Sequence, residues 1–282
     1  MDINEVLQKV YETLPPQPSL KFRITKQQTG LFDSKIGGTP YFPKNMEYPT
    51  GKQNDFAGKP LTLLAQLNFS ELPHIQDFPT KGILQIFIAA DDLYGMPTDY
   101  GEGQTKQNNF RIIYHEDIIT DESQLMSADE MPDYSGDDES YLPFSGEYLL
   151  TAEEPDEMPA SMHDFRFEEL FINAYNELYD DSAEEIYDIL DDEEAENLYH
   201  MNDSAFAYIG GYPIFSQRDP REYDDIADCD TVLFELDSVF GCEEAKDINI
   251  MWGDVGTGCF LIPRSNLKNL DFSRVVYNYD CG

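Results

Sequence analysis

A short segment with two arginines stands out in a very acidic chain, because its side chains could recognise a ligand or a partner protein. Residues 216–221 place Arg218 and Arg221 on either side of Asp219. Farther along, the single tryptophan, Trp252, lies two residues before Asp254. Guanidinium and indole groups are enriched among the residues that dominate binding energies. The candidate binding residues are therefore Tyr212, Phe215, Gln217, Arg218, Asp219, Arg221, Trp252 and Asp254.

These residues also have a purely structural interpretation, which the sequence favours. An arginine can be ion-paired inside an acidic protein, and a tryptophan can fill a core. In the functional interpretation they line a polar cleft that receives a ligand or a partner side chain. A deep pocket would favour an enzyme or a small-molecule-binding protein, whereas a broad acidic convex face would favour a protein partner.

The sequence predicts no catalytic residue, metal site or cofactor. The four histidines form no H-x-x-x-H pair, and no G-x-S-x-G motif exists. The glycine-rich residues 253–258 precede a strand and lack a lysine, so they predict a tight turn instead of a phosphate loop. No C-x-x-C pair is present. We therefore expect the four cysteines to be reduced thiols that pack mostly in strands: Cys229, Cys242, Cys259 and Cys281.

Charge limits the class of partner. The formal net charge is −38, from 56 acidic and 18 basic residues. Such a chain is repelled by nucleic acids and by anionic membranes, and it attracts basic proteins at low salt. Neither a secretory signal nor an apolar run of about 20 residues occurs, so we expect a cytoplasmic protein without membrane contact. Two alternatives to a basic partner remain. The charge could serve solubility alone, or the carboxylates could mimic the phosphates of a nucleic acid.

Two distant stretches have similar sequences. Residues 37–42 read GGTPYF, and residues 210–215 read GGYPIF. Three further matches follow in the same order, pairing 64–68 with 233–237, 82–86 with 258–262, and 111–114 with 274–277. We predict an internal duplication of a Gly-Gly-x-Pro turn plus three strands. The two units, 37–117 and 206–282, share one core in a single domain of residues 1–282.

The other segments predict flanking elements. Apolar residues from Ile3 to Leu14 recur at helical spacing until two prolines, and we expect this helix to lie on a sheet. Residues 19–29 alternate like an edge strand. Residues 118–205 form an acidic insertion that we expect to be peripheral and loop-like to about residue 161. After residue 161 we expect helices, and the second helix should begin with a capping box formed by Ser182 and Glu185.

Together these motifs resemble a known family. The two Gly-Gly-x-Pro segments, MWGD at residues 251–254 and the C-terminal Asp280-Cys281 are similar to the bacterial YwqG-like family of unknown function. The resemblance implies an α+β fold and a cytoplasmic bacterial protein, and it implies no reaction. Relatives occur in polymorphic toxin systems, where some are interpreted as immunity proteins.

The sequence as a whole predicts an α+β protein that binds a basic protein, such as a toxin, without catalysis. The alternative is an enzyme or small-molecule-binding protein that uses a cleft near Arg218, Asp219 and Arg221 and near Trp252 and Asp254.

Overall fold

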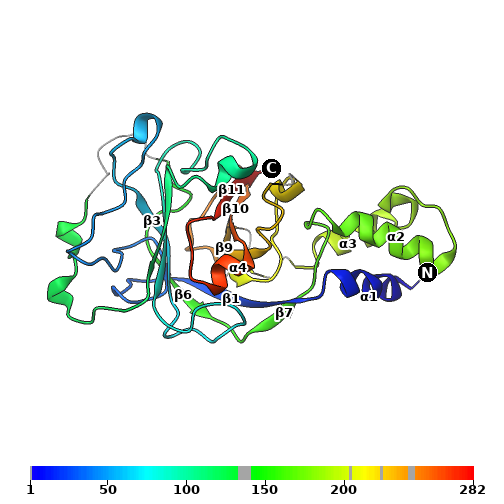
Figure 1. The fold of residues 1–282 in the computed structure, drawn as a ribbon, viewed down its shortest axis with the longest axis horizontal. Helices are drawn as coiled ribbons and strands as arrows, with labels where there is room; N and C mark the ends of the chain where they lie inside the picture. The colour runs from blue at the N-terminus through cyan, green and yellow to red at the C-terminus, as the bar shows by residue number, and fades with distance from the viewer. Residues whose placement is uncertain (1, 133–140, 203–204, 223–224, 241–244) are drawn as a thin grey trace.

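One curled antiparallel sheet dominates the molecule. A computed structural model describes residues 2–132, 141–202, 205–222, 225–240 and 245–282. In these ranges, strands pair in the order β11-β10-β9-β8-β1-β6-β2-β3-β4-β5, and β7 also pairs with β1 (Figure 1). The strands are β1 (Gln17–Lys26), β2 (Lys35–Ile36), β3 (Thr62–Asn68), β4 (Ile83–Ile88), β5 (Phe110–His115), β6 (Tyr148–Ala152), β7 (Asp156–Met158), β8 (Ala207–Gly210), β9 (Thr231–Asp237), β10 (Gly256–Ile262) and β11 (Val276–Cys281).

Helices are few in the described ranges, so the fold is α+β and mostly sheet. They are α1 (Ile3–Thr13), α2 (Phe167–Tyr179), α3 (Asp192–Tyr199) and α4 (Arg264–Lys268), with 3-10 turns η1 (Asn54–Phe56), η2 (Gly101–Thr105), η3 (Glu122–Gln124), η4 (Ala128–Glu130), η5 (Ile186–Asp188) and η6 (Pro220–Glu222). We call α1, α2, η5 and α3 the helical lobe. This lobe projects from one end of the molecule, and α1 lies beside α2 (Figure 1).

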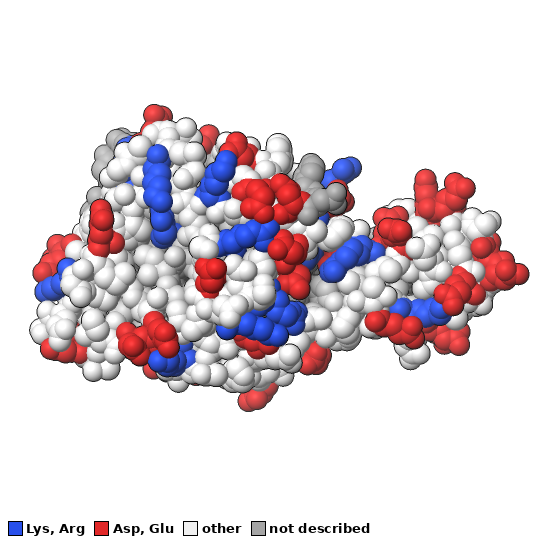
Figure 2. Space-filling model, in the orientation of Figure 1, with Lys and Arg blue, Asp and Glu red and all other residues white. Residues whose placement is uncertain are grey.

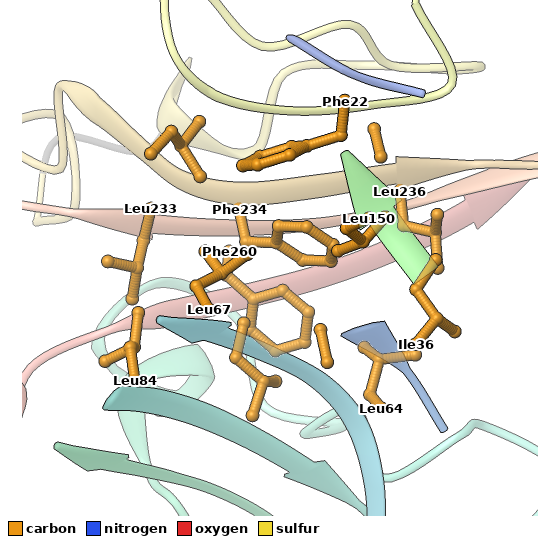
Figure 3. Packing of buried hydrophobic residues seen from close by; sticks show 14 of the residues in the cluster. Phe22, Ile36, Leu64, Leu67, Leu84, Leu150, Leu233, Phe234, Leu236 and Phe260 are labelled. Atoms are coloured by element: carbon orange, nitrogen blue, oxygen red, sulfur yellow. The ribbon is translucent and has the colours of Figure 1, made fainter. Parts of the chain in front are cut away.

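The main core fills the space inside the curled sheet. Phe234 and Phe260 on one wall face Leu67 and Leu84 on the other, with Phe22 of β1 close by (Figure 3). The three strands predicted for the first unit, near 61–67, 83–88 and 110–114, are confirmed as β3, β4 and β5. β3 and β4 are buried almost throughout, whereas β5 is only partly buried. A second cluster joins the helical lobe to the sheet through Phe167, Phe171 and other apolar side chains.

Two antiparallel meanders flank the centre of the sheet. One is β2-β3-β4-β5 and the other is β8-β9-β10-β11. In each, a buried polar side chain on the second strand accepts a backbone N–H that follows the Gly-Gly-x-Pro turn. The Gln66 Oε1 accepts from the Tyr41 N at 2.8 Å, and the Glu235 Oε1 accepts from the Ile214 N at 3.1 Å.

The strand pairing changes one sequence match. Gln85 lies opposite Gln66, and Cys259 lies opposite Glu235. This pairing equates Gln85 with Cys259, which is two residues away from the match of 82–86 with 258–262. A bulge interrupts the β9–β10 ladder at Phe260, and such a register shift is invisible in short apolar strings.

β1 is central, so the prediction of an edge strand is wrong. Its alternation of buried Leu20, Phe22 and Ile24 with polar residues is as expected. However, its first half pairs with β7 and β8, and its second half pairs with β6. The exposed basic side chains of β1 reflect one solvated face, not an unpaired edge.

The acidic insertion is less peripheral than predicted. Its residues Tyr148 and Leu150 are buried in β6, which lies between β1 and β2. Met158 of β7 is also buried. Part of the expected loop therefore holds the two halves of the sheet together.

The predicted helices form, with two corrections. α1 ends before the two prolines as expected, but it packs on α2 and not on the sheet, and the backbone N of Asp2 donates to the Tyr179 Oη at 2.9 Å. The last helix of the insertion starts at Asp192, where Asp191 and Glu194 form the capping box, and not at Ser182. Three adjacent acids near the N-terminus of α3 suit its dipole.

Candidate functional site

Arg221 is the centre of a buried ion-pair cluster. Its side chain is 1% exposed. The Nε donates to the Asp219 Oδ1 at 2.9 Å, and a terminal nitrogen donates to the Asp164 Oδ2 at 3.0 Å. Asp164 also accepts from Arg166 at 2.7 Å. The cluster therefore ties the insertion to the turn before β9 and fits the structural interpretation of residues 216–221.

The ion pairs offset the cost of burial in this cluster. Burial alone would raise the pKa of Asp164, but the hydrogen bond from Arg166 and the charge of Arg221 outweigh it, so this pKa lies below its usual range. Burial likewise works to lower the pKa of Arg221, and the charge of Asp219 raises it above its usual range. Asp164 and Arg221 therefore both stay charged at neutral pH.

Four other candidates do not line the cleft that contains the remaining three. Trp252 is fully buried, with its ring 5.4 Å from that of Tyr94 and 5.7 Å from that of Tyr279. Tyr212 and Phe215 are buried in the second core cluster. Asp254 is exposed in a turn of residues 253–255, so the predicted tight turn forms, but residues 256–258 already belong to β10.

The remaining candidates, Gln217, Arg218 and Asp219, line a cleft of about 770 Å³. This cleft lies between the loop from Met96 to Gln104, the segment from Gln217 to Glu222 and the end of β11. The other lining residues are Met96, Pro97, Thr98, Asp99, Tyr100, Gln104, Pro220, Glu222, Asn278, Tyr279 and Asp280. Segments that are more than 170 residues apart in sequence thus meet at one opening.

Arg274 holds one wall of the cleft in place. Its Nε donates to Glu102 of η2 at 3.1 Å, and its Nη1 donates to Asp228 at 2.8 Å. A carboxylate oxygen of Asp225 accepts from the backbone N of Glu102 at 3.0 Å. On the floor, the Met96 sulfur accepts from the backbone N of Tyr279 at 3.1 Å.

Asp280 and Gln104 bring side-chain acceptors to the lining of the cleft. The Asp280 carboxylate accepts from the backbone N of Ser216 at 3.2 Å and of Gln217 at 2.9 Å. Burial raises the pKa of Asp280 in spite of these bonds. Gln104 is 4% exposed and donates to the Asn278 Oδ1 at 3.3 Å. The Gln104 Oε1 is buried and has no donor among the described residues.

Sequence reasoning located one wall of this cleft and missed the others. Residues 96–104 carry no motif, and Asp280 was noted only as part of the repeat and of the family resemblance. The signal that could have drawn attention is an aromatic-acid pair, Tyr279-Asp280, next to the C-terminus. The contact of Gln104 with the neighbouring Asn278 could not be inferred, because it depends on how a long loop crosses β11.

Two buried histidines have structural contacts. The His115 Nε2 lies 2.9 Å from the Gln85 Oε1, and burial lowers its pKa to about 4. His163 contacts the carbonyl oxygen of Phe215 at 2.9 Å. Within the described ranges, no three His, Cys, Asp or Glu side chains gather as a metal site would require. Cys229, Cys259 and Cys281 are free thiols, and Cys242 lies outside the described residues.

The helical lobe presents an acidic surface. Residues 162–200 contain fourteen Asp or Glu and one basic residue, Arg166. In Figure 2 the lobe shows mainly acidic and neutral atoms, whereas lysines and arginines are spread over the body. Tyr187 is 64% exposed, next to a hollow lined by Met162, Ala195, Tyr199 and other residues.

Comparison with known proteins gives a family but no activity. No helix in the described part of the chain has the length and apolar character needed to cross a membrane. No curated protein matches the sequence. A family model described as a domain of unknown function (DUF1963) matches residues 34–281, which is most of the chain. The chain therefore belongs to the DUF1963 family.

Proposed function

We propose that this protein is a non-enzymatic binding module whose helical lobe captures a basic partner protein. The observation that carries the proposal is the nearly single-signed charge of the projecting lobe, with fourteen acids against one base in residues 162–200. A field of this sign speeds the encounter with a basic protein and repels acidic ones. Neutralisation of a toxin is the sharpest form of the proposal.

Apolar groups on the lobe would supply affinity after the encounter. The hollow beside Tyr187 measures about 340 Å³ and is lined also by Asp192, Glu196 and His200. Exposed aromatic residues that are surrounded by polar ones are typical anchors at protein interfaces. We therefore propose that Tyr187 contacts the partner, while the acids around it set the approach and the orientation.

Two sets of substitutions test the lobe. The lobe set replaces four exposed acids: Asp180→Asn, Glu184→Gln, Asp192→Asn and Glu196→Gln. Asp180 is the C-cap of α2 with a positive φ, which asparagine also tolerates. The body set removes the same charge elsewhere, through Glu47→Gln, Glu71→Gln, Asp129→Asn and Glu154→Gln. Equal melting temperatures would show that both proteins remain folded.

The capture experiment compares these two sets. Immobilised wild type, lobe set and body set are incubated with extract of the source organism, and captured proteins are quantified. The proposal expects a basic protein that the wild type and the body set retain and that the lobe set loses. Equal capture by all three proteins, or an acidic partner, would refute the role of the lobe.

Tyr187→Ser tests the anchor separately. If Tyr187 is a hot spot, the substitution weakens binding of the captured partner by about 2 kcal/mol, roughly thirtyfold in Kd. Because Tyr187 is mainly exposed, the fold should keep its stability. Unchanged affinity would leave the acids as the sole contacts.

We also propose the finer points that the resemblance implies, a bacterial YwqG-like protein in the cytoplasm. An internal duplication is part of this proposal. It is supported by the shared strand order of the two meanders and by the equivalent acceptor positions of Gln66 and Glu235. A structural superposition of the meanders that aligns Gln66 on Glu235 and Gln85 on Cys259 tests it.

A small-molecule-binding or enzymatic role is the second candidate. The observation in its favour is the cleft of about 770 Å³ that contains Gln217, Arg218 and Asp219. Arg221 and Trp252 support this cleft from the core, since their side chains are buried. A ligand screen that shows saturable binding lost on substitution in the cleft, and unaffected in the lobe set, would favour this role.

A further inference from the structure

We propose that the cleft between residues 96–104 and the end of β11 is a binding site for a guanidinium group. This site is separate from the helical lobe, so the proposal goes beyond the capture of a basic protein by acidic charge. It would recognise an arginine side chain of a peptide or a free guanidino compound.

A cation can complete the hydrogen bonding of the cleft. The Gln104 Oε1 is a buried acceptor that has no donor among the described residues. The Asp280 carboxylate accepts two backbone N–H groups, and no cationic side chain in the described ranges forms an ion pair with it. A carboxylate has about four acceptor positions, so Asp280 can still accept from a ligand. A neutral donor could satisfy the Gln104 Oε1, whereas a cation also compensates the charge of Asp280.

Shape and aromatic groups favour guanidinium over ammonium. A guanidinium is planar and presents five N–H donors, so it can contact several separate acceptors at once. Tyr279 and Tyr100 both line the cleft, and Tyr100 is 79% exposed. Planar cations stack on such rings, which adds binding energy that a lysine ammonium gains less well.

The charges around the cleft agree with a cationic ligand. Asp99 and Glu222 lie at the cleft together with Asp280, and Asp219 is already paired with Arg221. Asp99 is paired with Lys106 at 3.0 Å, so its charge is partly compensated. Arg218 is the cationic residue among the lining side chains, and it is exposed. Its positive charge repels a cationic ligand. Removing this charge should therefore strengthen binding, whereas removing the charge of Asp280 should weaken it.

Calorimetric titration with matched probes tests the proposal. N-acetyl-L-arginine amide and N-acetyl-L-citrulline amide, called arginine amide and citrulline amide below, have nearly the same shape, and only the first is charged. We expect saturable binding of arginine amide in the millimolar range or tighter, and at least tenfold weaker binding of citrulline amide. Equal binding of the two amides, or no binding of arginine amide at about 10 mM, would overturn the proposal.

Substitutions locate the site. Asp280→Asn removes the charge and keeps an acceptor oxygen for one of the two backbone N–H groups, so its melting temperature is checked first. We expect this variant to bind arginine amide at least about tenfold more weakly. Arg218→Gln should strengthen binding two- to fivefold, because it removes repulsion. Asp129→Asn, on the body far from the cleft, is the control and should change nothing. An unchanged affinity in Asp280→Asn, or loss of binding in Arg218→Gln, would contradict a cation site.

Two further probes distinguish the sources of the guanidinium group. We expect the peptide Gly-Arg-Gly to bind several-fold more tightly than agmatine, because Pro97, Pro220 and Tyr100 offer contacts for a peptide backbone. If agmatine binds with an affinity equal to or higher than that of the peptide, the natural ligand is a free guanidino compound. The assignment of a guanidinium site would then still hold. Lysine amide serves as the matching ammonium probe. If both guanidinium probes bind more weakly than lysine amide, the preference for guanidinium is wrong.

Discussion

Glu235 is buried in the sheet, and its ionisation should make the stability of the protein depend on pH. It is 1% exposed, and its Oε1 accepts from the Tyr208 hydroxyl at 2.6 Å and from the Ile214 N at 3.1 Å. Burial raises the pKa of Glu235 well above its usual range, and the nearby Asp237 adds to the effect. No cationic side chain pairs with it among the described residues. We predict that Glu235→Gln stabilises the protein at neutral pH.

The sign follows from proton binding in the two states. Above the ordinary pKa of a glutamate, about 4.3, the unfolded chain releases the proton that the folded state retains. The unfolded state then binds fewer protons, so stability falls as pH rises, by up to about 1.4 kcal/mol per pH unit. The amide cannot ionise, so the advantage of Glu235→Gln should grow by up to about 2.7 kcal/mol between pH 5 and pH 7.

The comparison of slopes removes other contributions. An amide keeps acceptors for Tyr208 and Ile214 but brings an N–H group that needs a partner, as the Gln66 Nε2 finds at the Leu31 oxygen 2.8 Å away. That cost does not vary with pH. Repulsion among the many surface acids is present in both proteins and cancels in the difference.

Urea unfolding at several pH values from 5 to 8 measures the effect. Wild type, Glu235→Gln and Glu12→Gln are compared, where Glu12 is an exposed residue of α1. We expect the stability difference from wild type to increase with pH for Glu235→Gln and to stay nearly constant for Glu12→Gln. Parallel stability curves for wild type and Glu235→Gln would refute a protonated Glu235.

Three further predictions concern the framework of the site. Arg221→Met should cost about 3–5 kcal/mol, because it leaves Asp219 buried without its cation and leaves Asp164 with Arg166 alone, whereas Arg218→Met should stay within about 0.5 kcal/mol; equal urea midpoints for the two would argue against the buried cluster. Gly258→Ala should cost about 1–3 kcal/mol and alter tryptophan fluorescence, because a Cβ there would lie 2.4 Å from the ring of Trp252; an unchanged spectrum and midpoint would mean that the contact is looser. Deleting residues 145–160 removes β6 and β7, so we expect no cooperative thermal transition by circular dichroism, and a wild-type-like transition would show that β6 is dispensable.

Local patterns predicted the strands that are mainly apolar. β3, β4 and β9 are buried along nearly their whole length, and in each of them one buried polar residue, Gln66, Gln85 or Glu235, interrupts the apolar run. β6 escaped prediction because it is short and lies in an acidic region, where only Tyr148 and Leu150 mark its buried face. Its place beside β1 depends on a pairing across more than 120 residues, which local spacing does not encode.

The candidate site was predictable in part. The sequence identified residues 216–221 from residue type alone, and it left open whether their arginines are buried or exposed. In the structure Arg221 is buried and Arg218 is exposed, although the two are three residues apart. The difference arises because Asp164, from the insertion, reaches Arg221. Loop 96–104 and the end of β11 meet only through the fold, so Gln104 and Asp280 could not be connected.

The association rate of the captured partner tests the proposed role of the helical lobe most directly. Stopped-flow kinetics are recorded for wild type, lobe set and body set over a range of ionic strength. We predict that at low salt the lobe set associates about 3–10-fold more slowly than the body set, with a smaller change in dissociation. The wild-type rate should fall steeply as salt rises, because screening acts within ~10 Å at 0.1 M. Equal association rates for the two sets, or a wild-type rate that is independent of salt, would contradict capture by the acidic lobe.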